Sequence, residues 1–365
     1  IQLSLLFTLK VEYQVLFSTQ AILAISMMII FYAARRGAQN KPLANIQFRT
    51  ADRFVGFISL IALVLLVATN IDHMRIVSFE DVYELRFKAA EVSTGLINNY
   101  LISWLTYCFI SYFFARGIVY RNWSMLLFGL LSSVLLYMST GAKLAILLLP
   151  ITVVLGWLWG SGRNFFPRLL AVIIISFGVL VFFVPDAGIG IWLKSLVLVR
   201  IFGTAGWVAS KYHEYFSVEG FTYYSHVGPI NALTDMYPYG SLSLGQMIGL
   251  AYSGSSEANF NGSFWASDGF AALGAVGVLV ITPFVAGLLY VINRVMTQFD
   301  SRFCVIWMTG FFMALLNVPL STALLSGGGI IILTQAWWLS KTGRVRRSLM
   351  PTQKLAPSTV NPSMT

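Results

Sequence analysis

Long apolar runs limit what this chain can fold into. Runs of about 20 apolar residues, the length of helix that crosses a bilayer core, recur along the sequence. Of the 365 residues, 57% are hydrophobic and 10% charged, whereas a soluble domain is about 25% charged. We therefore predict an all-α, polytopic transmembrane helical bundle of nine or ten spans. They are a partial one at the start, then 14–34, 54–70, 96–115, 123–139, 143–160, 168–185, 269–292, 303–320 and 325–340.

The distribution of Lys and Arg predicts the orientation of the bundle. If the spans alternate in direction, one side receives 16 of the 24 basic residues but only two of the 14 acids. Basic loops stay in the cytoplasm, so the net charge of +10 indicates topology and not a nucleic-acid partner. The two longest loops on the opposite, periplasm-like side are 70–95 and 185–268. We expect the chemistry on that side.

The two cysteines of the chain do not indicate a disulfide or a metal site. Cys108 and Cys304 both fall inside predicted spans, which argues against a disulfide framework or a thiolate metal site. We expect no metal and no cofactor.

The predicted spans divide the chain into four parts. They are N-terminal transmembrane helices with the outer loop 70–95 (1–185), a large outer loop with interfacial helices (186–268), C-terminal transmembrane helices (269–340) and a disordered cytoplasmic tail (341–365).

Four cations near the outer face are candidates to bind a pyrophosphate. Arg86 precedes a span, and Lys143 is the only charge in the tight turn Ser-Thr-Gly-Ala-Lys. Arg200 and Lys211 are eleven residues apart, so they share one face of a helix that we expect to lie on or dip into the outer interface. Guanidinium groups bind phosphate oxygens bidentately. The alternative for each cation is a solvated or interface-anchoring side chain.

Carboxylates, a histidine and aromatic side chains gather in the large outer loop and at its end. Candidates for a general base are Asp268, Glu257 and His226; Asp268 could instead be a helix N-cap. Gly269, Gly274 and Gly277 follow, and small residues allow close helix packing. Aromatic faces and amides suit sugars, although an interfacial aromatic belt is the alternative. The sugar-binding candidates are Tyr223, Tyr224, Asn259, Asn261 and Trp265.

Several function classes lack their sequence signals. The chain has no His-Glu-x-x-His, Walker loop, Cys-x-x-Cys or Gly-x-Ser-x-Gly, which argues against zinc proteases, P-loop enzymes, thiol oxidoreductases and α/β-hydrolases. No acid or histidine lies deep inside a predicted span, where proton-coupled pumps place them.

Four segments resemble the bacterial O-antigen and oligosaccharide repeat-unit polymerases (Wzy type). They are the first outer loop with Arg86, the turn ending at Lys143, the Leu-Val-Arg-Ile-Phe segment around Arg200, and the stretch 257–277. The last has asparagines, then an acid, then aromatic and Ala residues before a Gly-spaced helix. The resemblance covers about 14–340. The turn departs from the usual Gly-Ser-Arg, because here it reads Gly-Ala-Lys.

The resemblance implies a GT-C-like, metal-independent, inverting glycosyltransferase in the bacterial inner membrane, with its active site facing the periplasm. It would move a growing glycan from undecaprenyl pyrophosphate onto the non-reducing end of a new lipid-linked unit. The implied partners are the lipid-linked oligosaccharide, membrane lipid and a chain-length regulator protein. Alternatives are an O-antigen ligase, which would be expected to have a histidine such as His226 in the large loop, a flippase or transporter, and a membrane acyltransferase.

Overall fold

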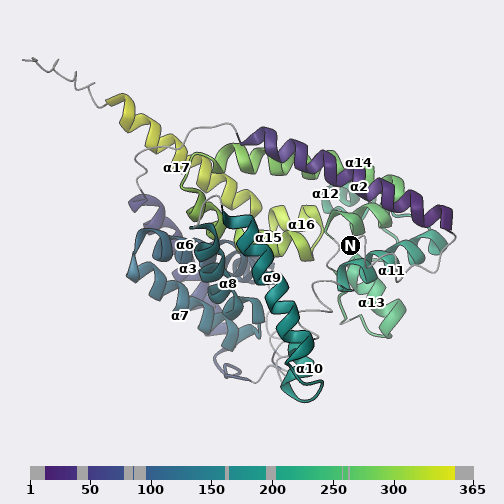
Figure 1. Cartoon of the computed structure of the whole chain (residues 1–365), viewed down its shortest axis with the longest axis horizontal. Helices are drawn as coiled ribbons and strands as arrows, with labels where there is room; N and C mark the ends of the chain where they lie inside the picture. Colours follow the sequence, from purple (N-terminus) through teal and green to yellow (C-terminus); the bar gives the residue numbers. More distant parts are fainter. Residues whose placement is uncertain are drawn as a thin grey trace, which may run out of the picture.

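The computed structural model describes residues 13–38, 48–77, 85, 96–160, 164–194, 203–256, 258–261 and 264–349. All regular structure within these ranges is helical (Figure 1). A helix covers each of the nine complete predicted spans. They are α2 (Tyr13–Gly37), α3 (Arg49–Asn70), α5 (Leu96–Trp104) continued by η1 (Leu105–Phe109) and α6 (Ile110–Tyr120), α7 (Trp123–Thr140), α8 (Lys143–Trp159), α9 (Phe165–Phe182), α14 (Trp265–Met296), α15 (Ser301–Asn317) and α17 (Gly329–Leu349).

Shorter helices fill the segment between the two sets of long helices. They are α10 (Ile189–Lys194), α11 (Thr204–Glu219), α12 (Gly228–Thr234) and α13 (Leu244–Ser253), with α16 (Leu320–Leu325) further along. The predicted helix with Arg200 and Lys211 on one face lies partly in 195–202, outside the described residues. α17 continues to Leu349, so this helix extends into the segment 341–365 that the sequence predicts as a tail.

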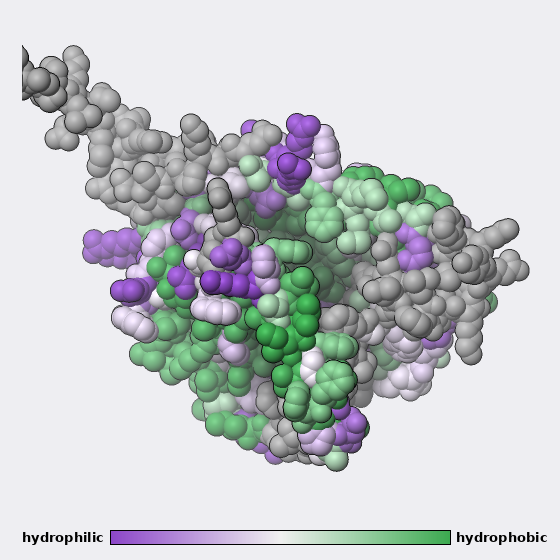
Figure 2. Space-filling model, in the orientation of Figure 1, coloured by the Kyte–Doolittle hydropathy of each residue, from purple (hydrophilic) through white to green (hydrophobic). Residues whose placement is uncertain are grey.

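Six helices of the described chain are long and apolar enough to cross a membrane. This confirms the all-α, transmembrane prediction in its coarse form, whereas α8 and α15 are apolar but have 17 residues each. Large apolar side chains on these helices are exposed, and Figure 2 shows hydrophobic surface over much of one face. The six are Ser18–Gly37, Arg49–Asn70, Asn98–Tyr120, Trp123–Thr140, Phe165–Phe182 and Trp265–Met296.

Two hydrophobic cores hold the helices together. One lies among α3, η1, α6, α7, α8, α15 and α17 and contains the fully buried Phe113 and Trp307. The other lies among α2, α11, α13 and α14 and contains Tyr212 and Phe270. α14 packs along α2, and the two run side by side in Figure 1. α14 therefore has a central place in the second core.

The first turns of α14 fold back on the rest of that helix. Leu273 and Gly274 have non-helical backbone angles, with Gly274 at φ +64°, a region that glycine adopts without strain. A β-carbon on Gly269 would lie 2.5 Å from the backbone of Val278, whereas residues nine apart in a straight helix are separated by roughly 13 Å. The predicted close packing at these glycines therefore occurs within one hairpin, between 265–272 and 275–296.

Candidate functional site

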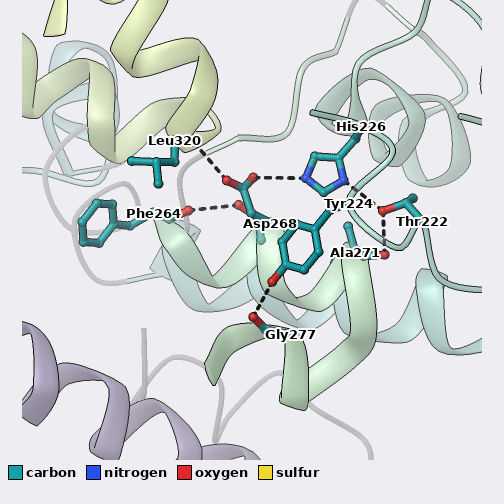
Figure 3. A network of polar contacts seen from close by, with 9 residues as sticks. Thr222, Tyr224, His226, Phe264, Asp268, Ala271, Gly277 and Leu320 are labelled. Atoms are coloured by element: carbon teal, nitrogen blue, oxygen red, sulfur yellow. Dashed lines mark hydrogen bonds and ion pairs between the residues drawn. The ribbon is translucent and has the colours of Figure 1, made fainter. Parts of the chain in front are cut away.

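A buried polar cluster forms where this hairpin meets the 221–227 loop. Asp268 is the fourth residue of α14 and is 2% exposed. Phe264, not Asp268, occupies the N-cap position, so the N-cap interpretation of Asp268 is wrong. The carboxylate faces inward toward His226 and the start of α16 (Figure 3). The hairpin thus carries the acid into the protein interior and not to a helix end in solvent.

The two carboxylate oxygens of Asp268 have different surroundings. Oδ2 accepts a hydrogen bond of 3.0 Å from the backbone N–H of Leu320. Oδ1 is buried without a hydrogen bond and lies 4.0 Å from Nε2 of His226, which also has none. Burying a polar atom without a partner costs about 1–3 kcal/mol. Two such atoms facing one another are therefore a place where a ligand group could bind.

The hydroxyl of Thr222 determines which nitrogen of His226 carries the hydrogen. This hydroxyl donates to the carbonyl oxygen of Ala271 at 3.0 Å, so in its 2.9 Å contact with His226 the hydrogen comes from Nδ1. Nε2 then presents a lone pair to Oδ1 of Asp268. Both atoms are acceptors, so satisfying them takes two donated hydrogens, as two neighbouring hydroxyl groups would supply.

Burial keeps His226 neutral. The side chain of His226 is 3% exposed, and desolvation lowers the pKa of its imidazole from 6.5 to about 4 because a buried cation is disfavoured. Near pH 7 the imidazole is therefore an uncharged hydrogen-bonding group. Asp268 has no permanently charged partner among the described residues.

The 221–227 loop is fixed to both arms of the hairpin. The N–H groups of Thr222 and Tyr223 donate to the carbonyl oxygens of Ala271 and Ala272, at 2.8 and 3.0 Å. These carbonyls end the short arm and would otherwise lack partners. The hydroxyl of Tyr224 donates to the carbonyl oxygen of Gly277 on the long arm at 2.7 Å. These bonds position His226 opposite Asp268.

Backbone strain accompanies this arrangement. Tyr223 and Tyr224 have φ values of +48° and +63°, and Phe264, just before α14, has +53°. Non-glycine residues in this region cost on the order of 1–3 kcal/mol each and gather at functional sites. Three of them adjoin the Asp268 cluster, so the surrounding contacts hold the loop in a conformation that its sequence does not favour.

The structure brings together only some of the predicted site residues. Asp268, His226 and Tyr224 meet in one cluster (Figure 3). Trp265 lies one turn before Asp268 and has a buried Nε1 without a hydrogen bond. Tyr223 is 64% exposed. The amide oxygens of Asn259 and Asn261 pack against Gly245 at the start of α13, away from the contacts that surround Asp268.

The predicted pyrophosphate cations do not join the cluster. Lys211 forms a 2.6 Å ion pair with Glu214 and lies 4.6 Å from the ring centre of Tyr252. Its charge is therefore compensated. Lys143 begins α8, a helix with no residue in the Asp268 cluster. Arg86, Arg200 and the predicted base Glu257 lie outside the described residues, and their roles stay predictions.

Sequence reasoning missed Thr222 and the N–H group of Leu320. Thr222 lies four residues before His226, a spacing that carries no signal in a loop. The Leu320 amide donates through the backbone, so no residue type could reveal it. The pairing of Asp52 with Arg116 inside the protein was also missed, because both residues appeared as charges beside a span.

No set of three or more His, Cys, Asp or Glu side chains within the described ranges could hold a metal ion. Comparison with known proteins gives no assignment: no protein-family profile, curated protein or solved structure matches the chain. The geometry of the Asp268 cluster and the residues that surround it are therefore the basis for a functional proposal.

Proposed function

We propose that this chain is a glycosyltransferase of the bacterial inner membrane that polymerises lipid-linked oligosaccharide units at the periplasmic face. The observation that carries the proposal is the pair of Asp268 and His226, buried face to face with an unpartnered atom on each side. A carboxylate beside a neutral imidazole can accept a proton from a substrate hydroxyl. The resemblance in sequence supplies the substrate class.

The proposed reaction transfers a glycan from a lipid pyrophosphate to a sugar hydroxyl. The acceptor oxygen attacks the anomeric carbon of the donor glycan from the face opposite the leaving group, which inverts that carbon. The carbon–oxygen bond to pyrophosphate breaks, and the leaving group takes the electron pair. Oδ1 of Asp268 takes the hydroxyl proton, while Nε2 of His226 accepts a hydrogen bond from a neighbouring hydroxyl of the acceptor and so orients it. Both atoms are enclosed, so side chains around the pair must move to admit the acceptor.

The developing negative charge on the pyrophosphate needs cations. Arg86 and Arg200 are assigned this role from sequence alone. Lys211 is the weaker candidate, because Glu214 already neutralises it at 2.6 Å. Lys143 would act from the first turn of α8. In this proposal the arginines stabilise the leaving group while Asp268 and His226 activate the acceptor.

The membrane setting supports a lipid-linked substrate. Six helices long and apolar enough to cross a bilayer are consistent with a substrate whose polyprenyl chain dissolves in the membrane, and the Lys and Arg distribution predicts that the 186–268 segment faces the periplasm. The exposed side chain of Tyr223, next to Tyr224 of the cluster, supports a role in sugar contact. A chain-length regulator protein would be a further partner.

The proposal is tested by adding a purified lipid-pyrophosphate-linked repeat unit to the protein in detergent, with EDTA present. We expect a ladder of lengthening glycans and release of lipid pyrophosphate. Asp268→Asn should abolish the ladder, while Asp235→Asn, at an exposed turn where asparagine also tolerates the positive φ of +50°, should preserve it. Absence of any ladder from the unmodified protein, with the lipid-linked unit bound, would contradict polymerase activity.

A ligase is the second candidate, and one observation favours it. The histidine expected of such an enzyme in the large loop is present as His226, and it lies 4.0 Å from the buried Asp268. A ligase would transfer the glycan once, to a lipid A core. The same assay separates the two, because a ligase gives a single product that needs the core acceptor, whereas a polymerase gives a ladder without it.

A further inference from the structure

A second polar site lies away from the Asp268 cluster, at the ends of α3, α6 and α7. A cavity of about 420 Å³ is lined by Phe48, Arg49, Asp52, Arg53, Arg116 and Met125. These residues come from the first turns of α3 and α7 and the last turns of α6. The Lys and Arg distribution predicts that this end faces the cytoplasm. No residue of this cavity belongs to the Asp268 cluster.

Both carboxylate oxygens of Asp52, the acid that lines the cavity, accept hydrogen bonds. Arg116 donates from Nε to Oδ1 of Asp52 at 2.9 Å and from Nη2 to Oδ2 at 2.7 Å. The hydroxyl of Tyr112 adds a 2.7 Å hydrogen bond to Oδ1. The guanidinium of Arg116 also lies 4.1 Å from the ring centre of Phe48. Asp52 and Arg116 therefore neutralise one another and line one side of the cavity.

Arg49 and Arg53 have no acidic partner among the described residues. Arg49 and Arg53 are exposed, and no hydrogen bond or ion pair joins either to another described residue. They are four residues apart on α3, so their side chains lie on the same face of the helix. With the Asp52–Arg116 pair neutral, the cavity has a net charge of two positive units from these side chains.

The start of α3 adds backbone donors to these charges. α3 begins at Arg49, and its N-cap residue, Phe48, supplies no side-chain hydrogen bond. The first N–H groups of a helix point outward and the helix dipole is positive there, so this end attracts anions. The cavity thus combines two guanidinium groups that have no ion-pair partner among the described residues with the start of a 22-residue helix whose N-cap residue gives no side-chain hydrogen bond.

We propose that this cavity binds a phosphate group, either on the headgroup of an anionic lipid or on a free phosphate compound. Two guanidinium forks can hold the phosphate oxygens bidentately. The ring of Phe48 and the side chain of Met125 offer apolar contact to the part of the ligand beyond the phosphate. The site is independent of the proposed glycosyl transfer, because it uses none of the same residues.

The test uses the full chain in a neutral detergent and measures binding by native mass spectrometry and by tryptophan fluorescence. The probes are short-chain phosphatidylglycerol, short-chain phosphatidylcholine, inorganic phosphate and pyrophosphate. We expect saturable binding of phosphatidylglycerol or of a free phosphate, and little of phosphatidylcholine. The Arg49→Gln/Arg53→Gln variant should raise Kd by about tenfold or more, as loss of charge-assisted hydrogen bonds does.

The matched control is Arg35→Gln/Arg36→Gln, which removes the same charge from the exposed end of α2. It should change Kd by less than about twofold. Competition by inorganic phosphate or pyrophosphate would identify a free phosphate compound as the ligand, and binding of the lipid alone would identify a headgroup. Equal losses in the two variants, or binding that never saturates, would overturn the proposal.

Discussion

Gly277→Ala tests the hairpin that positions Asp268. A β-carbon at Gly277 would overlap the carbonyl oxygen of Gly269 and lie 3.2 Å from its α-carbon. These are backbone atoms, which cannot rotate away, so we expect the upper part of the 1–3 kcal/mol range for overpacking. Alanine regains about 1 kcal/mol of helix propensity. The net loss in the free energy of unfolding should be about 2 kcal/mol.

Gly287→Ala on the same helix is the matched control, because a β-carbon at Gly287 would have no neighbouring atom within 4 Å. It should gain about 1 kcal/mol, so the two variants should differ by about 3 kcal/mol. The assay is unfolding by sodium dodecyl sulfate in mixed micelles, followed by tryptophan fluorescence. Equal stability of the two variants would show that Gly269 and Gly277 are not in contact, and the reasoning that places Asp268 opposite His226 would fail.

Three other changes test individual contacts of the fold. Because folding lowers the pKa of His226 from 6.5 to about 4, the unfolded chain binds a proton at a higher pH than the folded protein does. The free energy of unfolding should therefore fall by about 3 kcal/mol as the pH drops from 6.5 to 4. His226→Gln should make this fall smaller in a denaturant titration repeated across pH. Tyr224→Phe removes the bond to Gly277 and should cost about 1 kcal/mol, whereas the same change at the exposed Tyr223 should cost almost nothing. Arg116→Gln leaves Asp52 buried and unpaired and should cost about 3–5 kcal/mol in the same unfolding assay, against less than about 0.5 kcal/mol for the exposed Arg121→Gln; equal losses would contradict the buried pair.

The long helices could be predicted from the sequence because bilayer-length apolar runs leave few alternatives. The exact ends of these helices could not be predicted from the sequence. The predicted spans 54–70 and 96–115 leave Asp52 and Arg116 outside, yet α3 and α6 extend past them and the two side chains pair in the interior. A charge next to an apolar run looks the same in the sequence whether it is solvated or buried beside a partner.

The site was partly predictable for a similar reason. Asp268 is a candidate in the sequence because it is an acid at the end of a polar stretch, and His226 and Tyr224 are candidates because they lie in the large outer loop. Their meeting depends on the turn at Leu273 and Gly274, where α14 reverses. Glycines spaced along an apolar run predict close packing but not the partner, which here is another part of the same helix. The N–H groups of Thr222, Tyr223 and Leu320 act through the backbone, which residue types do not reveal.

The role of Asp268 as the general base is tested by the initial rate of glycan polymerisation by Asp268→Asn, compared with that by Asp235→Asn. Asparagine has the shape of aspartate and keeps an oxygen that can accept the Leu320 hydrogen bond, but it cannot take a proton. General-base catalysis contributes about 10²–10⁴-fold, so we predict at least a hundredfold lower rate for Asp268→Asn and an unchanged rate for Asp235→Asn. Polymerisation by Asp268→Asn at the rate of the unmodified protein would contradict the role of this carboxylate.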